Sequence, residues 1–399
     1  MAKSINILTV NAGSSSIKCS LYSYESTKLQ ALSRLEIASI GQGDAIYSQS
    51  MPGQQHESRA LSLETMTEAQ EFLFGQLDEL LQGASLDAVG HRVVHGGPKL
   101  HTTTEIAPNV LSELEKLQAY DPEHAPAAVS LIRRFYDHFQ GIRQYASFDT
   151  GFFHDLPVEV KLLPLPREYY SEGLRKYGFH GLSYRSILQK LKDMEHRYPV
   201  PHRLIVAHLG SGASVAAIKD GHPVDTTMAF TPASGIPMST RSGDLDPGVV
   251  SYLATRYNLD VNAFNELVHE KSGLLGMSEL SGNMLTLLEA QATNQSAAEA
   301  VSVFCYQVRK AIGSLAAALG GIDALVFTGG IGEKSAEIRQ RIAGELDHLG
   351  IELDHLKNQE QATVISHRLS GARVFVLPSD ESIIIAQDTV NLLTEKNGG

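Results

Sequence analysis

The chain has 399 residues, of which 43% are hydrophobic and 20% are charged, and its 33 basic and 45 acidic side chains give a net charge of −12. This composition is typical of a globular protein, and the length predicts two or three domains. The excess of carboxylates argues against a nucleic-acid partner or a membrane-surface partner, because both require a basic footprint. Any anionic ligand must therefore meet local cations.

The cysteine count bears on where the protein works. Cys19 and Cys305 are the two cysteines, and both stand in apolar surroundings. So low a count does not support a disulfide-dependent secreted fold and suits a reducing compartment. No apolar run reaches 18 residues, the length of a membrane span, and the N-terminus lacks the apolar stretch of a signal peptide. We expect a soluble cytoplasmic protein.

The first part of the chain alternates strand-like apolar runs with helical patterns. The predicted strands cover residues 5–10, 17–22, 88–94 and 144–148. The predicted helices cover residues 73–81, 110–117 and 127–139. The polar stretch 41–59 is expected to be a loop.

The second part repeats this scheme. Its predicted strands cover residues 204–209, 214–219, 325–328 and 374–377. Its predicted helices cover residues 249–257, 297–319, 338–349 and 382–393. Such an alternation predicts an α/β protein with two similar domains.

Prolines suggest where the two domains meet. Three prolines occur within residues 156–167, as is typical of a segment that connects two domains. We place the first domain at 1–150 and the second at 151–381, and we expect a closing helix at 382–399 to pack back on the first domain.

Two turns of small residues follow predicted strands. The first is 11–16 (NAGSSS), with Lys18 behind it, and the second is 208–212 (HLGSG). Small residues let a backbone approach a ligand closely, and hydroxyls and amides can bind phosphate. A plain hairpin turn is the alternative for each. Their occurrence at the start of two similar domains favours phosphate binding.

A third turn, 329–334 (GGIGEK), lies between a predicted strand and a helix. Glycines in that position can form a nucleotide or anion site. The chain has neither the Gly-Lys-Ser/Thr signature of a P-loop nor, in this turn, the spacing of a dinucleotide fingerprint. Taken alone, the segment favours a tight strand–helix turn without a ligand.

Five charged or titratable residues occupy positions at which ligand binding or catalysis is expected. Asp149 and Glu381 follow predicted strands, where ligands collect in α/β sheets, and carboxylates there suit Mg²⁺. The alternative for each of these carboxylates is that it caps the start of a helix. Arg92, in a buried-looking strand, and Arg241, in a polar loop, could clamp a carboxylate or a phosphoryl group, with a structural salt bridge as the alternative. His180 lies between glycines and next to Phe179, which favours a functional use, but taken alone it is better explained as a core histidine.

Taken in order, these motifs resemble those of the acetokinase family of short-chain acyl kinases, in the superfamily of actin and hexokinase. The resemblance runs from Asn11 to Glu381 and rests on residues 90–97 (GHRVVHGG), 177–181 (YGFHG), 230–232 (FTP), 240–247 (TRSGDLDP) and 330–333 (GIGE). It implies two actin-like (ribonuclease H-like) α/β domains with the active-site cleft between them. It also implies a homodimer.

The resemblance implies a reaction as well: Mg²⁺-dependent, reversible transfer of the γ-phosphoryl group of ATP to acetate by direct in-line displacement, giving acetyl phosphate and ADP. Mn²⁺ is the alternative metal. A carboxylate nucleophile is already ionised at neutral pH, so no general base is needed. The difficulty is repulsion between two anions, which favours catalysis by positioning and electrostatic stabilisation.

The site residues follow from the same resemblance. The implied catalytic residues are Asp149, Arg92, His180 and Arg241. The implied metal ligands are Asn11, Asp149 and Glu381. The implied contacts to the acid are Arg92, Val94, Phe179, Pro232 and His124. The implied contacts to the nucleotide are Asn11, Ser14, Ser16, Lys18, His208, Gly210, Ser211, Gly212, Gly330, Ile331, Gly332 and Glu333.

Some residues depart from the family pattern. Glu123 stands at an apolar position of the acyl pocket, and Ser211 and Lys334 replace asparagines near the nucleotide. Further departures are Phe153, Leu182 and Tyr184. Propionate or another short acid therefore stays open as the substrate, because one methylene in an apolar pocket discriminates by only about 1–3 kcal/mol. A different phosphoryl donor is a second alternative.

Two functions of other classes remain. A kinase for a hydroxyl substrate would use Asp149 as a general base, but a neutral hydroxyl does not require the two arginines. An actin-like ATPase without acyl kinase activity would use the same fold for a conformational output.

Overall fold

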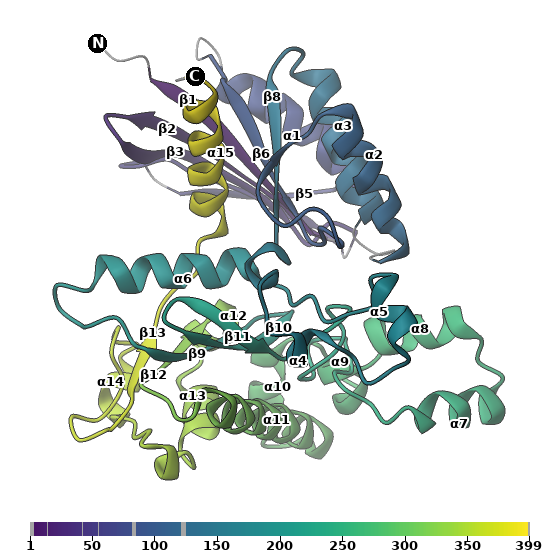
Figure 1. Ribbon diagram of the computed structural model, residues 1–399, viewed down its shortest axis with the longest axis vertical. Helices are drawn as coiled ribbons and strands as arrows, with labels where there is room; N and C mark the ends of the chain where they lie inside the picture. The colour runs from purple at the N-terminus through teal and green to yellow at the C-terminus, as the bar shows by residue number, and fades with distance from the viewer. Residues whose placement is uncertain are drawn as a thin grey trace. The chain divides into compact units, whose positions relative to one another are not determined.

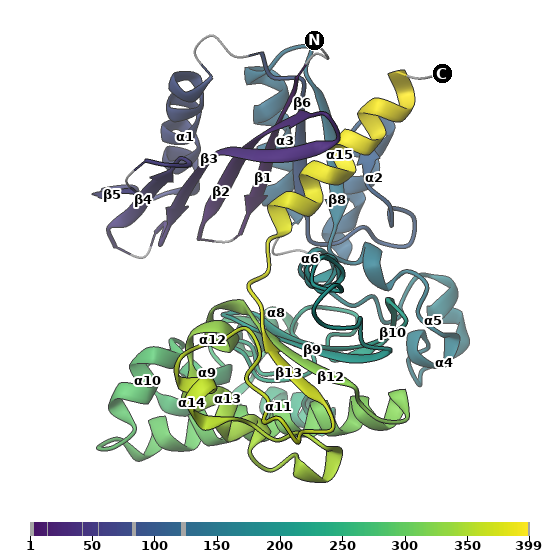
Figure 2. The same cartoon turned by 90° about the vertical axis from the view of Figure 1, so that its left-hand side faces the viewer.

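The computed structural model describes residues 4–13, 15–41, 43–54, 56–81, 85–120 and 125–397. The chain divides into two compact units, which Figures 1 and 2 show as two groups of elements. Unit 1 contains Met1–Phe152 and Asp380–Gly399, and unit 2 contains Phe153–Ser379. Each unit is built on one β-sheet with helices packed on it, which confirms the α/β fold class.

Unit 1 has an eight-stranded sheet in the order β5-β4-β3-β2-β1-β6-β8-β7. Its strands are β1 (Ile5–Ala12), β2 (Ile17–Glu25), β3 (Lys28–Ala38), β4 (Ala45–Ser50), β5 (Glu57–Leu61), β6 (Ala88–Val93), β7 (Thr104–Glu105) and β8 (Arg143–Phe148). Its helices are α1 (Met66–Leu80), α2 (Pro108–Lys116), α3 (Ala125–His138) and α15 (Glu381–Asn397), with 3₁₀ turns at Leu117–Ala119 and Gly151–Phe153. Strands β1, β6 and β8 run parallel, so their carboxyl ends meet at one edge of the sheet.

The core of unit 1 follows from the two-residue period of its strands. Leu8 packs with the buried face of α1 and with α3, whereas its neighbour Ile7 packs against α15. Successive side chains of a strand point to opposite faces, so β1 joins two apolar layers. Figure 2 shows α15 crossing one face of the sheet. At Gly90 on β6 a Cβ atom would lie 2.6 Å from the side chains of Ile385 and Thr389, so this helix needs a glycine beneath it.

Unit 2 has a five-stranded sheet in the order β11-β10-β9-β12-β13. Its strands are β9 (Arg203–Leu209), β10 (Ala213–Lys219), β11 (His222–Thr226), β12 (Ala324–Thr328) and β13 (Arg373–Val376). Its helices are α4 (Val158–Lys161), α5 (Arg167–Ser171), α6 (Gly181–Asp193), α7 (Gly248–Tyr257), α8 (Val261–Glu270), α9 (Gly273–Ser278), α10 (Met284–Ala290), α11 (Gln295–Leu319), α12 (Gly329–Lys334), α13 (Ala336–Ala343) and α14 (His355–Gln359), with a 3₁₀ turn at Asp347–Leu349. Strands β9, β12 and β13 run parallel, and Figures 1 and 2 show α6 and α11 on opposite faces of this sheet.

Two predicted elements were wrong. The stretch 41–59, expected to be a loop, contains β4 and the start of β5, which pair with each other at the edge of the sheet. The side chains of β5 are mostly exposed, so main-chain pairing forms this strand without an apolar pattern. The helix expected at 338–349 ends at Ala343, and Leu346 and Leu349 are reached through a turn that begins at Gly344.

The chain passes between the units after Phe152 and again after Ser379. Residues 156–167 therefore lie inside unit 2. Glu381, placed in the second domain on sequence grounds, lies in unit 1. Among the described residues, no helix is both long enough and apolar enough to cross a membrane.

Candidate active site

Four polar side chains meet at the carboxyl edge of the unit 1 sheet. Asn11 lies near the end of β1, Arg92 near the end of β6, Asp149 directly after β8, and Glu381 at the first position of α15. Their strands are parallel neighbours, so residues far apart in sequence reach the same edge. We call Asn11, Arg92, Asp149 and Glu381 the arginine cluster.

Arg92 is the centre of this cluster. It donates from Nε and Nη2 to the two oxygens of Asp149, at 2.9 and 2.5 Å, and from Nη1 to Oδ1 of Asn11 at 3.0 Å. The Oε2 atom of Glu381 accepts from Nδ2 of Asn11 at 2.7 Å and lies 3.3 Å from Nε of Arg92. The bidentate contact to Asp149 fixes the plane of the guanidinium group.

The charges of the cluster do not cancel, because two carboxylates face one guanidinium. The side chain of Asp149 is 1% exposed, that of Arg92 17% and that of Glu381 14%. Burial alone would lower the pKa of Arg92, but Asp149 and Glu381 outweigh it, and the net shift is upward. The arginine is thus a fixed cation beside an excess negative charge.

The donor set of the arginine cluster fits a magnesium ion. Mg²⁺ is usually bound through one or two protein carboxylates, and water or phosphate oxygens complete its shell. Asp149 and Glu381 provide two carboxylates, and the excess negative charge favours a cation. Within the described residues there is no group of three or more His, Cys, Asp or Glu side chains that could hold a metal by themselves.

The other residues of unit 1 that were predicted for the site either lie outside the described residues or form contacts other than those of the arginine cluster. Ser14 and His124, together with Glu123, lie outside the described residues. The main-chain carbonyl of Ser16 accepts from Gly13 at 2.8 Å and closes the turn after β1. Lys18 forms an ion pair with Glu36 at 2.9 Å, and half of its side chain is exposed.

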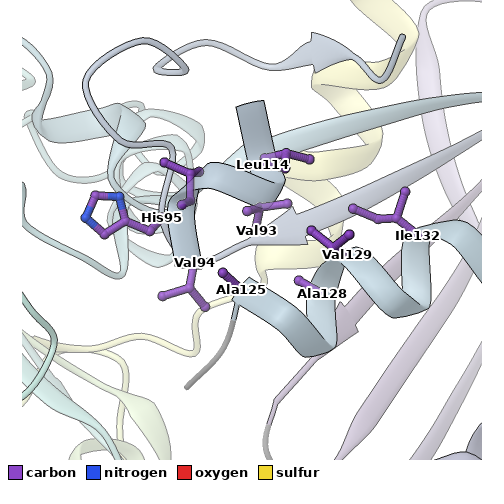
Figure 3. A pocket seen from close by; sticks show the side chains of 9 residues that line it. Val93, Val94, His95, Leu114, Ala125, Ala128, Val129 and Ile132 are labelled. Carbon is purple, nitrogen blue, oxygen red and sulfur yellow. The ribbon is translucent and has the colours of Figure 1, made fainter. Parts of the chain in front are cut away.

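Val94 borders a small apolar cavity, shown in Figure 3, between the end of β6 and helices α2 and α3. The lining residues are Val93, Val94, His95, Leu114, Leu117, Ala125, Ala128, Val129 and Ile132. The cavity measures about 10 Å³, which is room for about one water-sized group.

Unit 2 brings a second set of residues together. In the antiparallel pair of β9 and β10, His208 lies opposite Ser214, and the turn of Gly210, Ser211 and Gly212 joins the two strands. The His180 ring lies over His208, with ring centroids 4.4 Å apart. A Cβ atom at Gly212 would lie 3.4 Å from Nε2 of His180 and 3.7 Å from Nη1 of Arg241. We call His180, His208, Gly212 and Arg241 the histidine cluster.

The backbone holds His180 in an unusual conformation. Its φ of 61° is left-handed, which costs a residue other than glycine about 1–3 kcal/mol. His180 is the N-cap of α6, yet its side chain caps no amide of that helix. The ring instead bonds through Nδ1 to Oγ of Ser214 at 2.8 Å.

Arg241 is placed by a loop that main-chain bonds hold. Its carbonyl accepts from Met238 at 3.0 Å, and Ser239 N donates to Ser211 O at 3.1 Å, which ties this loop to the turn between β9 and β10. Nη1 of Arg241 lies 3.4 Å from the carbonyl of Pro232, a buried residue. Phe179, before His180, is also buried.

The third turn differs from the simple anion site that its glycines suggest. The carboxylate of Glu333 accepts from Gly329 N at 3.0 Å, so the chain's own carboxylate occupies the start of α12. Gly329 has a φ of +78°, and a Cβ atom there would lie 2.6 Å from the carbonyl of Leu209, at the end of β9. Gly330, Ile331 and Gly332 follow within α12. The amide of Gly329 is therefore already satisfied by a carboxylate of the same turn.

Sequence reasoning missed a buried arginine behind this turn. Arg339 is fully buried and donates from Nη1 to the carbonyls of Gly332 and Glu333, at 2.9 and 2.8 Å, and from Nε to Asn358 at 2.8 Å. Burial lowers its pKa to about 10. Nothing in the sequence separates Arg339 from the more exposed Arg341 on the same helix.

The chain is similar to known proteins over nearly its whole length. The Acetokinase family matches residues 6–387. Acetate kinase 1 of Latilactobacillus sakei is 38% identical over 97% of this chain and 99% of its own length, and the acetate kinase of Bacillus velezensis is 35% identical with the same coverage. The crystal structure of Porphyromonas gingivalis acetate kinase aligns with a TM-score of 0.84 at 35% identity, covering 98% of this chain and 100% of that one. A propionate kinase from Francisella tularensis aligns with a TM-score of 0.87 at 31% identity, covering 96% and 98%.

Proposed function

The chain belongs to the acetokinase family, and from this we infer that it is a phosphotransferase with a carboxyl group as acceptor. It transfers the γ-phosphoryl group of ATP reversibly to acetate, giving acetyl phosphate and ADP. The relatives reported above are kinases of carboxylic acids, so a hydroxyl kinase and an ATPase without acyl kinase activity are not favoured.

The structural observation that carries the proposal is the arginine cluster. A partly buried guanidinium held flat by Asp149 at the carboxyl edge of a sheet, beside carboxylates that would hold a divalent cation, is a preorganised site for an anion. A carboxylate substrate needs such a cation, because it must approach a phosphoryl group that is also negative. It needs no general base, since it is ionised at neutral pH.

The histidine cluster supplies further donors for the same reaction. Arg241 would neutralise charge on the transferring group, and Nε2 of His180 would donate to its equatorial oxygens. The amides of the turn at Gly210–Gly212 would hold the phosphates of ATP, and the turn at Gly330–Gly332 would lie against the nucleoside. These donors are held by the fold before substrate binds, which is how preorganised groups stabilise developing charge.

We propose Mg²⁺ as the metal, with Asn11, Asp149 and Glu381 as the residues that hold it; Mn²⁺ has the same donor preference. When bound, it neutralises charge on the phosphate oxygens. For contacts to the acid we propose Arg92, Val94, Phe179, Pro232 and His124, as the family resemblance implies.

We also propose a homodimer. Helices α7 and α8 contain no buried residue, and Tyr252, Tyr257 and Val261 are 64%, 63% and 85% exposed. Exposed apolar side chains gathered on neighbouring elements mark association surfaces. A light-scattering mass of one chain at micromolar concentration would contradict this assignment. The cytoplasmic location stays a prediction.

The test of the function is acyl phosphate formation, trapped with hydroxylamine. Acetate, propionate and butyrate are compared with Mg²⁺ and ATP, and pyrophosphate replaces ATP in a parallel series. We expect the highest kcat/KM with acetate and ATP. No acyl phosphate from any acid or donor would refute the function, and a preference for propionate or pyrophosphate would refute its specificity.

A further inference from the structure

We infer that Ser214 and Tyr184 are positioning residues for phosphoryl transfer, which act through His180 and keep the proton of its neutral ring on Nε2. This inference rests on the proposed function and names residues of the same site. Nothing in the resemblance assigns a role to either residue, and Tyr184 was singled out in the sequence only as a departure from the family pattern.

The three side chains form a continuous hydrogen-bonded row inside unit 2. Nδ1 of His180 lies 2.8 Å from Oγ of Ser214, and that oxygen lies 2.6 Å from the hydroxyl of Tyr184. Ser214 and Tyr184 are fully buried, and the Tyr184 side chain also bonds with Thr226. Phe153 packs edge-on against the Tyr184 ring, with centroids 5.6 Å apart, so the phenol has little freedom to turn away.

The sheet fixes this row beneath the histidine ring. Ser214 pairs with His208 across β10 and β9, so both side chains stand on the same face, and the His180 ring lies over His208. Its Nδ1 side meets Ser214, whereas Nε2 faces the space in front of Gly212, which has no side chain. The same contacts that anchor one nitrogen therefore aim the other at the turn between β9 and β10.

The chemistry of the row determines which nitrogen carries the proton. A phenol is a stronger donor than an aliphatic hydroxyl, so Tyr184 donates to Ser214, and Ser214 then donates to Nδ1. A neutral imidazole that accepts at Nδ1 carries its proton on Nε2. Burial raises the pKa of Tyr184, so its hydroxyl stays protonated. His180 can thus donate from Nε2 to a phosphoryl oxygen without first becoming a cation.

A double-mutant cycle tests whether these residues act through His180. Ser214→Ala is expected to lower kcat about five- to tenfold, the loss for one buried hydrogen bond, with KM for ATP and acetate changed less than about twofold. Tyr184→Phe keeps the ring and should lower kcat less. In a His180→Ala background, Ser214→Ala should cause no further loss. Equal losses in both backgrounds, or an unchanged kcat for both single variants, would overturn the inference.

Controls separate this inference from folding and from the proposed function. Ser186→Ala removes another buried hydroxyl of α6, and Tyr145→Phe removes a buried phenol hydroxyl in unit 1; both should keep the wild-type kcat. Thermal unfolding of every variant reports its stability. If the wild-type protein forms no acyl phosphate, the proposed function fails; if it does and the cycle shows no coupling through His180, only this inference fails.

A second measurement does not depend on activity. Long-range proton–nitrogen NMR spectra of the wild-type protein, with His180 assigned by comparison with His180→Gln, show which ring nitrogen carries the proton. We expect Nε2 in the wild type and a mixture of tautomers in Ser214→Ala. A proton on Nδ1 in the wild type would contradict the inference, whatever the kinetics.

Discussion

The arginine cluster of unit 1 and the histidine cluster of unit 2 are held together by different kinds of interaction. In unit 1 a cation is held by carboxylates. In unit 2 a histidine with a left-handed backbone is held by a serine hydroxyl, which is itself bonded to a tyrosine hydroxyl. Removing one member of an ion pair leaves a buried charge, but removing a hydroxyl leaves only an unmet hydrogen bond. The arginine cluster should therefore lose stability when a charge is removed. The histidine cluster should lose activity when the position of its side chains changes.

The largest effect is expected from Asp149→Asn. This substitution keeps the shape of the side chain but removes the charge that faces Arg92 at two oxygens. We expect kcat to fall by about 100-fold or more and the free energy of unfolding to fall by about 2–4 kcal/mol, because two charge-assisted hydrogen bonds of Arg92 are weakened while Glu381 still faces the guanidinium. Denaturant unfolding and the hydroxamate assay measure the two losses.

Glu345→Gln is the matched control, because it neutralises a carboxylate that is 73% exposed in its ion pair with Arg309. It should change the free energy of unfolding by less than about 1 kcal/mol. If Asp149→Asn changed the free energy of unfolding no more than this control does, charge would not be what holds the arginine cluster together.

A smaller effect is expected from a buried histidine of unit 1. His91 on β6 is bonded to Gln144 at 2.7 Å, and burial lowers its pKa to about 4 from the model-compound value of 6.5. The unfolded chain therefore takes up this proton first as the pH falls. The stability that depends on neutral His91 is complete above pH 6.5 and is lost towards pH 4, by up to about 3 kcal/mol.

Urea unfolding of the wild type and of His91→Gln from pH 4 to 8 checks this. The wild type should lose more stability between pH 6.5 and 4 than the variant, which lacks the titrating ring. Parallel curves for the two proteins would show that His91 does not control this pH dependence.

The smallest effect on folding, with a clear effect on activity, is expected in unit 2. A methyl group at Gly212 fits at ordinary contact distance from His180 and Arg241 but fills the space in front of Nε2. We expect Gly212→Ala to fold normally and to lower kcat/KM for ATP about tenfold or more. Gly313→Ala on α11, where nothing lies within 4 Å, is the control and should keep the wild-type kcat/KM. Wild-type activity in Gly212→Ala would mean that the phosphates of ATP do not bind in front of Gly212.

The elements that the sequence predicted are those with a buried apolar pattern, such as β1, β9 and α11. The hairpin of β4 and β5 was missed because its side chains are largely polar and its pairing is made by the main chain. Arg92 and Asp149 could be found from their places at the ends of strands. The row from Tyr184 to His180 could not, because it depends on the register of β9 with β10 and on where α6 begins. Such distances are set by tertiary packing and have no local signal.

The most direct test of the central claim follows the oxygen of the acceptor. Acetate labelled with oxygen-18 in its carboxylate is incubated with ATP, Mg²⁺ and the protein, and the product is treated with hydroxylamine, which attacks the acyl carbon and expels phosphate. If the carboxylate attacks the γ-phosphorus, the released phosphate contains one labelled oxygen. Phosphate without the label, together with the absence of hydroxamate, would mean that water is the acceptor and would contradict the assignment of this protein as an acyl kinase.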